Sequence, residues 1–519
     1  MNLPSIALHR AHNASLSVYY NSDIITVVEF ERFLNLKNAS FDTFEPIRCQ
    51  NIILKHVYEY LKSIYGFDIY QKFIIGEGRY KNFPEEYKKY IPANEYIIDD
   101  SHHPAHASSS LYQSNFNEAL IVSFDGGSND GYFNIYLGEK GKDLNKIFGL
   151  FLDLGSHYHV FGSLCEDVKN YNCLTAAGKV LGLQSYGNVI PEWKNAIKSF
   201  YCFENFYWVD LEKRITELGI QIGLDLSTNN KLKGQTAYDL TRTSQEVFEE
   251  IFFSIVDPIV SQYELPIILT GGCALNIVLN TKVKTRYKKD VFVAPNSTDC
   301  GLSVGLLCKH FKPTNVIDVT YKGIEILDNS TLLGYFENKN GKLANIDEIV
   351  DNLSKNKILG VVQGNSEHGP RSLGNRSIIC SPISSQMKDV LNHKVKHREW
   401  FRPFAPIVRL EDVSEYFEWD GESRWMNFCP KVKQEYVDKI PAVVHVDGTA
   451  RVQTITKEQN IFMYELLTKF KEKTGIGVLV NTSFNVDGKP ILSTYKDAFK
   501  VYEETELDCL YLNGYYFSK

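Results

Sequence analysis

Residues 119–137 read ALIVSFDGGSNDGYFNIYL, an apolar run, an Asp/Gly-rich turn and a second apolar run. Both runs are rich in residues that favour β-structure, so we expect strands at Ala119–Phe124 and Gly131–Leu137. Glycines in the turn let another group approach the backbone closely. Asp125 follows the first strand directly, and a carboxylate in that position suits a metal–nucleotide site, although simple turn chemistry is the competing reading.

The start of the chain repeats this order of strand, polar turn and strand. We expect strands at Ser5–His9, Ser15–Tyr20 and Asp23–Phe30, with Asn21-Ser22-Asp23 as a hairpin connection. A strand, an Asp/Gly-rich turn and a strand, used twice, resemble the unit with which actin-like ATPases enclose a nucleotide.

The rest of the chain alternates helices with strands, which predicts an α/β fold. Apolar positions at helical spacing run through Leu240–Val256, and apolar strands are expected at Pro266–Leu269 and Val291–Ala294. Recognisable motifs thin out between 310 and 350, so we expect a boundary near residue 335, with domains 1–335 and 336–519. In the second domain we expect a strand at Lys357–Gln363, helices near 384–396 and 457–472, and a strand at Ile476–Val480.

Size and composition are those of an ordinary globular protein. The 519 residues exceed what one core holds and predict two to four domains. The net charge of −7 argues against a surface built as a whole for nucleic acid. We expect neither a secretion signal nor a membrane span, and ten cysteines without a CxxC pair fit free thiols. These features predict a cytoplasmic protein.

Four side chains in the first half are candidates for one metal site. On a helix beginning after Asp100-Ser101, His102 and His106 share a face, so both rings can reach one ion. Asp125 and Asp299 lie after strand ends, in glycine-containing turns. Structural histidines and turn aspartates are the alternative for each residue taken singly.

Three other stretches of the first half are candidates for binding a nucleotide or for catalysis. Gly271-Gly272 follows an expected strand and suits close approach of a nucleotide to the backbone, with a helix starting near Ala274. Lys179 offers a cation, but a solvated lysine in a turn is the simpler interpretation. His12, at the foot of the first hairpin, is by itself more often structural than catalytic.

The second half is rich in groups that bind anions. Arg371 and Arg376 lie in a run of Gly, Ser and Asn, and arginines form paired hydrogen bonds to anionic oxygens. A second cationic run ends among aromatic residues and proline, which favours packing over free solvation; it contains Lys394, Lys396, His397, Arg398 and Arg402. The strand at Ile476–Val480 runs into small polar side chains, where α/β sheets bind ligands. Together these elements predict an anion pocket large enough for a triphosphate.

Ten motifs in order give the chain a resemblance to the O-carbamoyltransferases of nodulation factors and antibiotics. They are HNAS (12–15), EFERF (29–33), HHPAHA (102–107), FDGGSNDG (124–131), GKVLGLQSYG (178–187), TGGCALN (270–276), NSTDCG (296–301), GNSEHGPRSLGNRS (364–377), KHREWFRPFAP (396–406) and NTSFNVDGKP (481–490). The resemblance implies a Kae1-like domain of the actin-like ATPase superfold followed by a YrdC-like domain. It also implies a carbamoyl-adenylate, made from ATP and carbamoyl phosphate, whose carbamoyl group passes to a hydroxyl.

The resemblance assigns expected roles to individual residues. It implies that His102, His106, Asp125 and Asp299 hold a divalent metal, with Fe²⁺ expected there and Mg²⁺ accompanying ATP, and that His12 is the base. The adenylate site would comprise Gly126, Gly127, Lys179, Gly271, Gly272 and Asn276. ATP and carbamoyl phosphate would be held by Arg371, Ser372, Asn375, Arg376, Lys396, Arg398, Arg402, Asn481, Thr482, Ser483 and Asn485, with Arg371 and Arg402 catalytic.

Two positions depart from the family pattern, and several functions remain open. Asn13 replaces the aspartate of HDAS, and Ala177 stands where glutamate is common. The acceptor can be a sugar, an antibiotic or another metabolite, with a hydroxymethylated pyrimidine nucleotide or DNA base as an alternative. Proteins that carbamoylate a cysteine during hydrogenase maturation have an acylphosphatase domain and CxxC motifs, and we find neither in this sequence. The net charge of −7 gives no support to a tRNA acceptor. An actin-like nucleotide switch without transfer activity is the alternative of another class.

Overall fold

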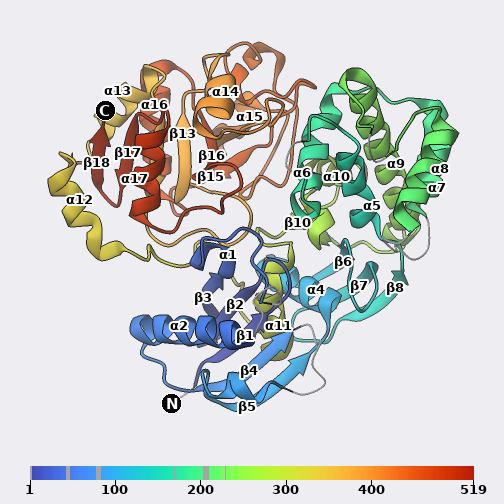
Figure 1. Ribbon diagram of the computed structural model, residues 1–519, viewed down its shortest axis with the longest axis horizontal. Coiled ribbons are helices and arrows are strands. Elements are labelled where there is room, and N and C mark those ends of the chain that lie inside the picture. Colours follow the sequence, from blue (N-terminus) through green and yellow to red (C-terminus); the bar gives the residue numbers. More distant parts are fainter. Residues whose placement is uncertain (1–2, 42–46, 77–82, 169–170, 203–209, 228–229) are drawn as a thin grey trace.

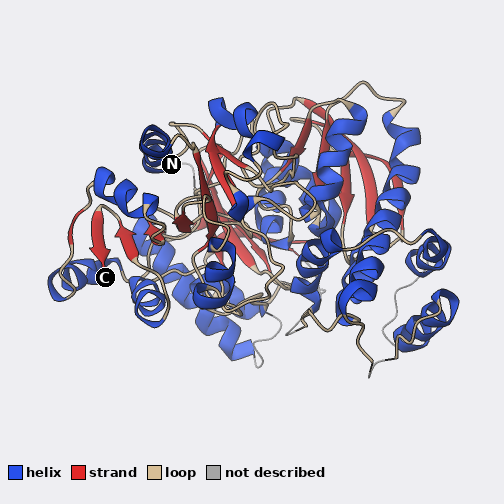
Figure 2. Ribbon diagram, turned by 90° about the horizontal axis from the view of Figure 1, so that it is seen from above, coloured by secondary structure: helices blue, strands red, loops and turns tan. Residues whose placement is uncertain are grey.

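The computed structural model describes residues 3–41, 47–76, 83–168, 171–202, 210–227 and 230–519. Within these ranges the strands form two five-stranded sheets and one eight-stranded sheet. In Figure 1 the first sheet (blue) lies at the bottom, and the C-terminal half (orange to red) and helices α5 to α10 (green) lie above it on opposite sides. Figure 2 shows the strands (red) flanked by helices (blue), as expected for an α/β fold.

The first two sheets have the same strand order and the same strand directions. In each, three antiparallel strands come first, and two further strands then run parallel to the first of the three. The first sheet contains, in spatial order, β3 (Asp23–Glu29), β2 (Ser15–Tyr20), β1 (Ser5–His9), β4 (Tyr70–Gly76) and β5 (Ala93–Asp99). The second contains β8 (Asn145–Leu150), β7 (Phe133–Glu139), β6 (Glu118–Phe124), β9 (Ile267–Thr270) and β10 (Val291–Val293). This duplication is what the actin-like interpretation requires.

The third sheet is built from the C-terminal part of the chain. It contains, in spatial order, β11 (Lys342–Leu343), β18 (Tyr515–Ser518), β17 (Cys509–Leu512), β12 (Leu359–Val362), β13 (Arg376–Cys380), β16 (Val478–Ser483), β14 (Ala405–Arg409) and β15 (Gln453–Ile455). Parallel and antiparallel pairs are mixed in it. The α/β class predicted from the sequence is therefore confirmed.

Helices cover the sheets on both faces. The helices before residue 320 are α1 (Phe30–Phe33), α2 (Ile47–Tyr65), α3 (Glu85–Lys88), α4 (His102–Gln113), α5 (Leu154–Ser163), α6 (Cys173–Leu183), α7 (Lys194–Tyr201), α8 (Leu211–Ile222), α9 (Gly234–Val260), α10 (Ile277–Tyr287) and α11 (Leu302–Phe311). Those after it are α12 (Leu332–Asn338), α13 (Ile346–Ser354), α14 (Met387–Asp389), α15 (Val413–Tyr416), α16 (Ile461–Thr474) and α17 (Tyr495–Glu504). No helix in the described ranges is long and apolar enough to cross a bilayer.

Several predicted boundaries shift for local reasons. The third strand ends at Glu29 because Phe30 already begins α1. The strand expected at Gly131–Leu137 starts at Phe133, after Gly131 takes a φ of 115°. The predicted helix at 384–396 is a short α14 followed by a π-turn, Val390–Val395.

Helices α4 and α11 pack against each other between the first two sheets. Helix α11 lies on β1, β2 and β4, and α4 lies on β6, β7 and β9. Gly305 permits this contact, because a Cβ there would lie 2.0 Å from the carbonyl oxygen of Ala105. The interface places the start of α4 beside the start of α11, where the candidate ligands lie.

Candidate active site

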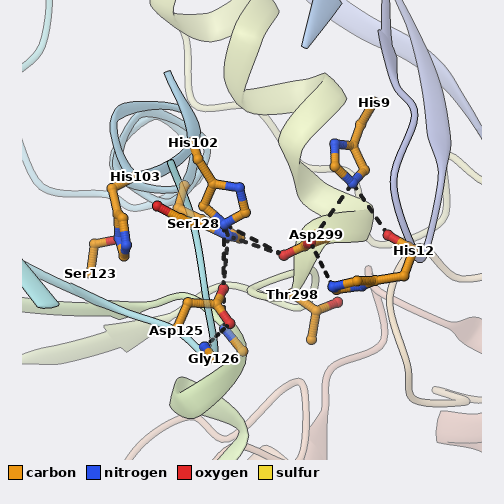
Figure 3. A network of polar contacts seen from close by, with 12 residues as sticks. His9, His12, His102, His103, Ser123, Asp125, Gly126, Ser128, Thr298 and Asp299 are labelled. Carbon is orange, nitrogen blue, oxygen red and sulfur yellow. Dashed lines mark hydrogen bonds and ion pairs between the residues drawn. The ribbon is translucent and has the colours of Figure 1, made fainter. Parts of the chain in front are cut away.

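Four polar side chains converge between the first two sheets (Figure 3). The Nε2 atoms of His102 and His106 lie 3.2 Å apart, and His106 Nε2 lies 3.1 Å from Asp125 Oδ2 and 3.4 Å from Asp299 Oδ1. The four ligand atoms all lie within 4.8 Å of one another. The structure thus brings together the four candidates that the sequence placed on one helix and in two separate turns.

The elements of the fold explain this convergence. Both histidines project from the first turns of α4, one helical turn apart. Asp125 follows β6, and its two carboxylate oxygens accept hydrogen bonds from the backbone N–H groups of Gly126 and Gly272, at 2.6 and 2.9 Å. The carboxylate therefore ties together the glycine turns after β6 and β9.

The donor set fits a divalent metal ion. Two imidazoles and two carboxylates suit first-row divalent metals. Ligands placed about 2.1 Å from an ion at tetrahedral angles lie roughly 3.4 Å apart, close to the separations found here. Burial raises the pKa of Asp299, but the facing imidazoles of His12 and His102 outweigh burial and hold that pKa below its usual range. The carboxylate is therefore in its metal-binding, ionised form.

His12 lies at the edge of this cluster. Its Nε2 is 3.4 Å from Asp299 Oδ2, and 46% of its side chain is exposed, so it can meet both the cluster and a ligand. The neighbouring Asn13 has a φ of 56°, a left-handed conformation that asparagine and aspartate both tolerate. The exchange of aspartate for asparagine at this position therefore preserves the backbone that presents His12.

His9 is a histidine of this site that the sequence analysis missed. It is buried, and its Nε2 lies 3.2 Å from the carbonyl oxygen of His12 and 3.8 Å from Asp299 Oδ2. As the last residue of β1, it looked like an ordinary strand residue.

One cavity of about 1010 Å³ joins this cluster to the C-terminal half. Among the candidates from the first half, its walls include His12, Asp125, Gly126, Gly127, Lys179, Gly272, Asn276 and Asp299. From the second half they include Arg371, Ser372, Lys396, Arg398, Arg402, Asn481, Thr482, Ser483 and Asn485. Two groups of residues that the sequence placed in separate domains therefore face the same space.

The arginines of the cavity crowd one another. Burial, followed by the charge of Arg402, lowers the pKa of Arg371 to about 10. Burial and Arg402 likewise lower the pKa of Arg398. Among the described residues, no carboxylate or carbonyl pairs with the guanidinium of Arg371. Crowded positive charge of this kind favours the binding of anions.

The simpler interpretation placed Lys179 in a turn as a solvated lysine, and this interpretation is wrong. Lys179 is part of α6 and is buried, and its ammonium lies 2.7 Å from Glu399 Oε1. Arg402 lies 3.3 Å from the other oxygen of the same carboxylate. Helix α6 lies beside Phe401, which is 3.4 Å from the Cβ position of Gly182, and the Lys179–Glu399–Arg402 ion pairs join the two halves beside the cavity.

Besides the buried His102 and His106, three residues predicted to bind the adenylate, ATP or carbamoyl phosphate do not line the cavity. The guanidinium of Arg376 is fully buried and donates to the carbonyl oxygens of Gln363, Gly364 and Asn375. Asn375 is hydrogen-bonded to Asn460 and to the carbonyl of Asn365. Gly271 has a φ of 91° and lies against Phe124, whose carbonyl oxygen would be 2.2 Å from an added Cβ. These residues shape the loops and are not exposed to a ligand.

Some residues of the cavity wall already form hydrogen bonds with other parts of the protein. Lys396 donates to the carbonyl oxygens of Ser483 and Asn485, and burial lowers its pKa well below the usual value. The Asn276 amide exchanges hydrogen bonds with Gln245 and caps α10 through Leu279 N. Asn481, Thr482 and Ser483 lie within β16, because the strand runs from Val478 to Ser483 and not over the predicted Ile476–Val480.

Other nitrogen-bearing side chains of the cavity wall lie outside the ten motifs, among them Lys37, Lys388, Arg451 and the imidazole of His445. Burial lowers the pKa of His445 to about 4, and its Nδ1 lies 3.1 Å from Thr449 Oγ1. In the described part of the chain, His445 Nε2 and Arg451 Nε have no hydrogen-bond partner. His445 and Arg451 come from loops without a periodic pattern, whereas Lys388 lies in α14, and only the cavity shows that these residues belong together.

We expect Arg451→Met to weaken binding of anions and leave the fold intact. Burial and the charges of Arg371, Arg398 and Arg402 all lower the pKa of Arg451, so removing its charge relieves repulsion. One lost hydrogen bond to a charged ligand costs about 1.5–3 kcal/mol, or roughly 10- to 150-fold in affinity. Titration calorimetry with ATP measures this loss, with the exposed Lys457→Met as control. Unchanged ATP affinity, or an equal loss in the control, would contradict a role in binding.

Comparison with known proteins assigns this architecture to a family. The family model described as "Carbamoyltransferase N-terminus" matches residues 24–308, and "Carbamoyltransferase C-terminus" matches residues 350–519. The uncharacterized protein MJ1051 of Methanocaldococcus jannaschii is 31% identical over 98% of both chains. Nodulation protein NolNO of Sinorhizobium fredii is 31% identical over 81% of this chain and 63% of its own length. A crystal structure of full-length HypF with phosphate and nucleotide bound shares 11% identity and a TM-score of 0.36, over 61% of this chain and 57% of that one.

Proposed function

The chain belongs to the carbamoyltransferase family, and from this premise we propose that it activates carbamoyl phosphate with ATP and transfers the carbamoyl group to a hydroxyl of a small-molecule acceptor. The observation that carries the proposal is the single cavity, which joins an arginine-rich wall to a metal-type cluster. An activation step and a transfer step then share one space. In this proposal, residues 336–519 supply the first step and residues 1–335 the second.

Activation would take place at the arginine-rich wall. Water cleaves carbamoyl phosphate into phosphate and carbamate, and a carbamate oxygen attacks the α-phosphorus of ATP, releasing pyrophosphate and forming carbamoyl-adenylate. Arg371 and Arg402 would neutralise the phosphate charges and align the reactants, with Arg398 and Arg451 beside them. Ser372, Thr482 and Ser483 would supply hydroxyl donors from the same wall.

Transfer would take place beside His12. The acceptor oxygen attacks the carbamoyl carbon, His12 takes its proton, and the bond from that carbon to the AMP oxygen breaks. Gly126, Gly127 and Gly272 would let the adenylate approach the backbone near Asp125. A divalent ion held by His102, His106, Asp125 and Asp299, with Fe²⁺ proposed, would neutralise negative charge on the nucleotide phosphate.

The test is incubation of the protein with ATP, carbamoyl phosphate and Fe²⁺. We expect pyrophosphate release that depends on carbamoyl phosphate, with carbamoyl-AMP identified by mass spectrometry. Formation of ADP alone would contradict the proposal and favour an actin-like nucleotide switch. Carbamoyl-AMP would justify screening sugars, other metabolites and hydroxymethylpyrimidines as acceptors.

A further inference from the structure

The loop that carries Arg371 is fastened to the metal-type cluster by buried contacts that the steps above do not use. We call residues 364–376 the arginine loop. Its His368 is buried, and its ring reaches across to the turn that carries Asp299, where Nε2 lies 3.0 Å from the carbonyl oxygen of Cys300. Residues 296 to 301 and the arginine loop are therefore in direct contact, although about 70 residues separate them in sequence.

The hydrogen bonds around His368 form a chain with one direction. A carbonyl oxygen only accepts, so Nε2 carries the proton and donates to Cys300, which leaves Nδ1 to accept from the Asn296 amide at 3.3 Å. The Asn296 carbonyl in turn accepts from Gln113 Nε2 at 2.9 Å. Gln113 is the last residue of α4, the helix that presents His102 and His106. The chain thus links both ligand-bearing elements to the arginine loop.

A second set of contacts, from Glu29 and Arg32, fixes the same loop. Arg32, buried in α1, donates to the carbonyl oxygens of Glu367 and Gly369. Glu29 accepts from the Gly369 backbone N–H at 2.9 Å. Gly369 has a φ of 113°, and a Cβ there would lie 2.3 Å from the carbonyl oxygen of Pro295, so only glycine fits this position.

We propose that Glu29, Arg32 and His368 are positioning residues, which hold the arginine loop in register with the Asp299 turn so that the carbamoyl-adenylate is retained between activation and transfer. This proposal rests on the proposed function. Arg371 lies two residues beyond the clamped Gly369, and Asp299 is the residue before Cys300, so the contacts set the spacing of the two reaction centres. A shift of the arginine loop would open the cavity between the arginine-rich wall and the metal-type cluster. Neither of these two centres would lose any of its side chains.

The experiment is a single turnover with ATP and carbamoyl phosphate and without acceptor, followed by rapid gel filtration. The ratio of protein-bound carbamoyl-AMP to pyrophosphate is measured, because adenylate that escapes is hydrolysed to AMP and carbamate. We expect His368→Leu to release pyrophosphate but to lower this ratio at least about 5-fold, since the hydrogen bond to Cys300 is lost. His368→Gln, whose amide can donate to the same carbonyl, should restore much of it.

Two further variants distinguish positioning from a general loss of stability. Gly369→Ala should lower the ratio of bound carbamoyl-AMP to pyrophosphate in the same way. It replaces His368→Leu as the test variant if His368→Leu does not fold. Arg424→Gln is the control, because it breaks a 2.9 Å ion pair with Asp318 that joins the same parts of the chain outside the cavity wall. A wild-type ratio in both His368→Leu and Gly369→Ala, or an equal fall in Arg424→Gln, would overturn the inference. Absence of pyrophosphate release from the wild-type protein would instead refute the proposed function.

Discussion

The His12→Asn variant should lose carbamoyl transfer by about 10²- to 10⁴-fold and keep the release of pyrophosphate, because a general base contributes about this much to one step. His12 is the exposed histidine of the cluster, 3.4 Å from Asp299 and open to the cavity. The arginine-rich wall where pyrophosphate would form contains none of the atoms that the substitution changes. Carbamoylated product is measured with the acceptor found in the screen, and pyrophosphate in the same reaction.

The matched control is His56→Asn, a histidine exposed on α2 and away from the cavity wall. It should behave as the wild-type protein in both assays. If His12→Asn lost both half-reactions equally, the role of base would be wrong and a structural role would replace it. Product formation at the wild-type rate would also rule out the base.

Asp299→Asn should reduce metal affinity and transfer by at least about 10-fold, because loss of a direct ligand should cost no less than the roughly 10- to 100-fold caused by losing a residue that supports a ligand. Asp299 faces His12, His102 and His106 at 3.4, 3.8 and 3.4 Å, so the substitution removes one of the two carboxylates of the cluster. Elemental analysis of the purified protein gives metal per chain, and a chelator applied to the wild-type protein should reproduce the loss of transfer.

Asp290→Asn is the control for this variant, because Asp290 is exposed at the start of β10 and does not line the cavity. It should keep one metal per chain. Metal retained in Asp299→Asn would contradict the ligand set. The identity of the ion follows from the same analysis: restoration of transfer by Zn²⁺ but not by Fe²⁺ would contradict the proposal of iron.

The parts of the site that follow local rules could be predicted from the sequence. His102 and His106 share a helix face because they are four residues apart, and Asp125 ends a strand because an apolar run stops there. The duplicated order of strand, turn and strand was visible for the same reason. Each of these depends on neighbours in sequence, so its geometry is set by a few residues.

Features that depend on distant partners could not be predicted. Lys179 looked like a turn lysine between glycines, yet it lies in α6, and the carboxylate that partners it lies 220 residues away in sequence. Arg376 looked like a ligand because of its motif, but its guanidinium holds the arginine loop together. Arg451 and His445 carry no pattern at all. Lys179 and Arg451 obtain their surroundings from segments far away in sequence, and Arg376 from the fold of its own loop.

The crowding of Arg371, Arg398, Arg402 and Arg451 has a consequence for the lifetime of the protein in a cell. Their mutual repulsion raises the free energy of the folded state when the cavity holds no anion. Ligands that bind only the folded state stabilise it in proportion to the logarithm of their concentration. The folded fraction, and with it resistance to cellular proteases, should therefore rise and fall with the supply of ATP. The chain would persist when its substrates are abundant and be degraded sooner when they are scarce.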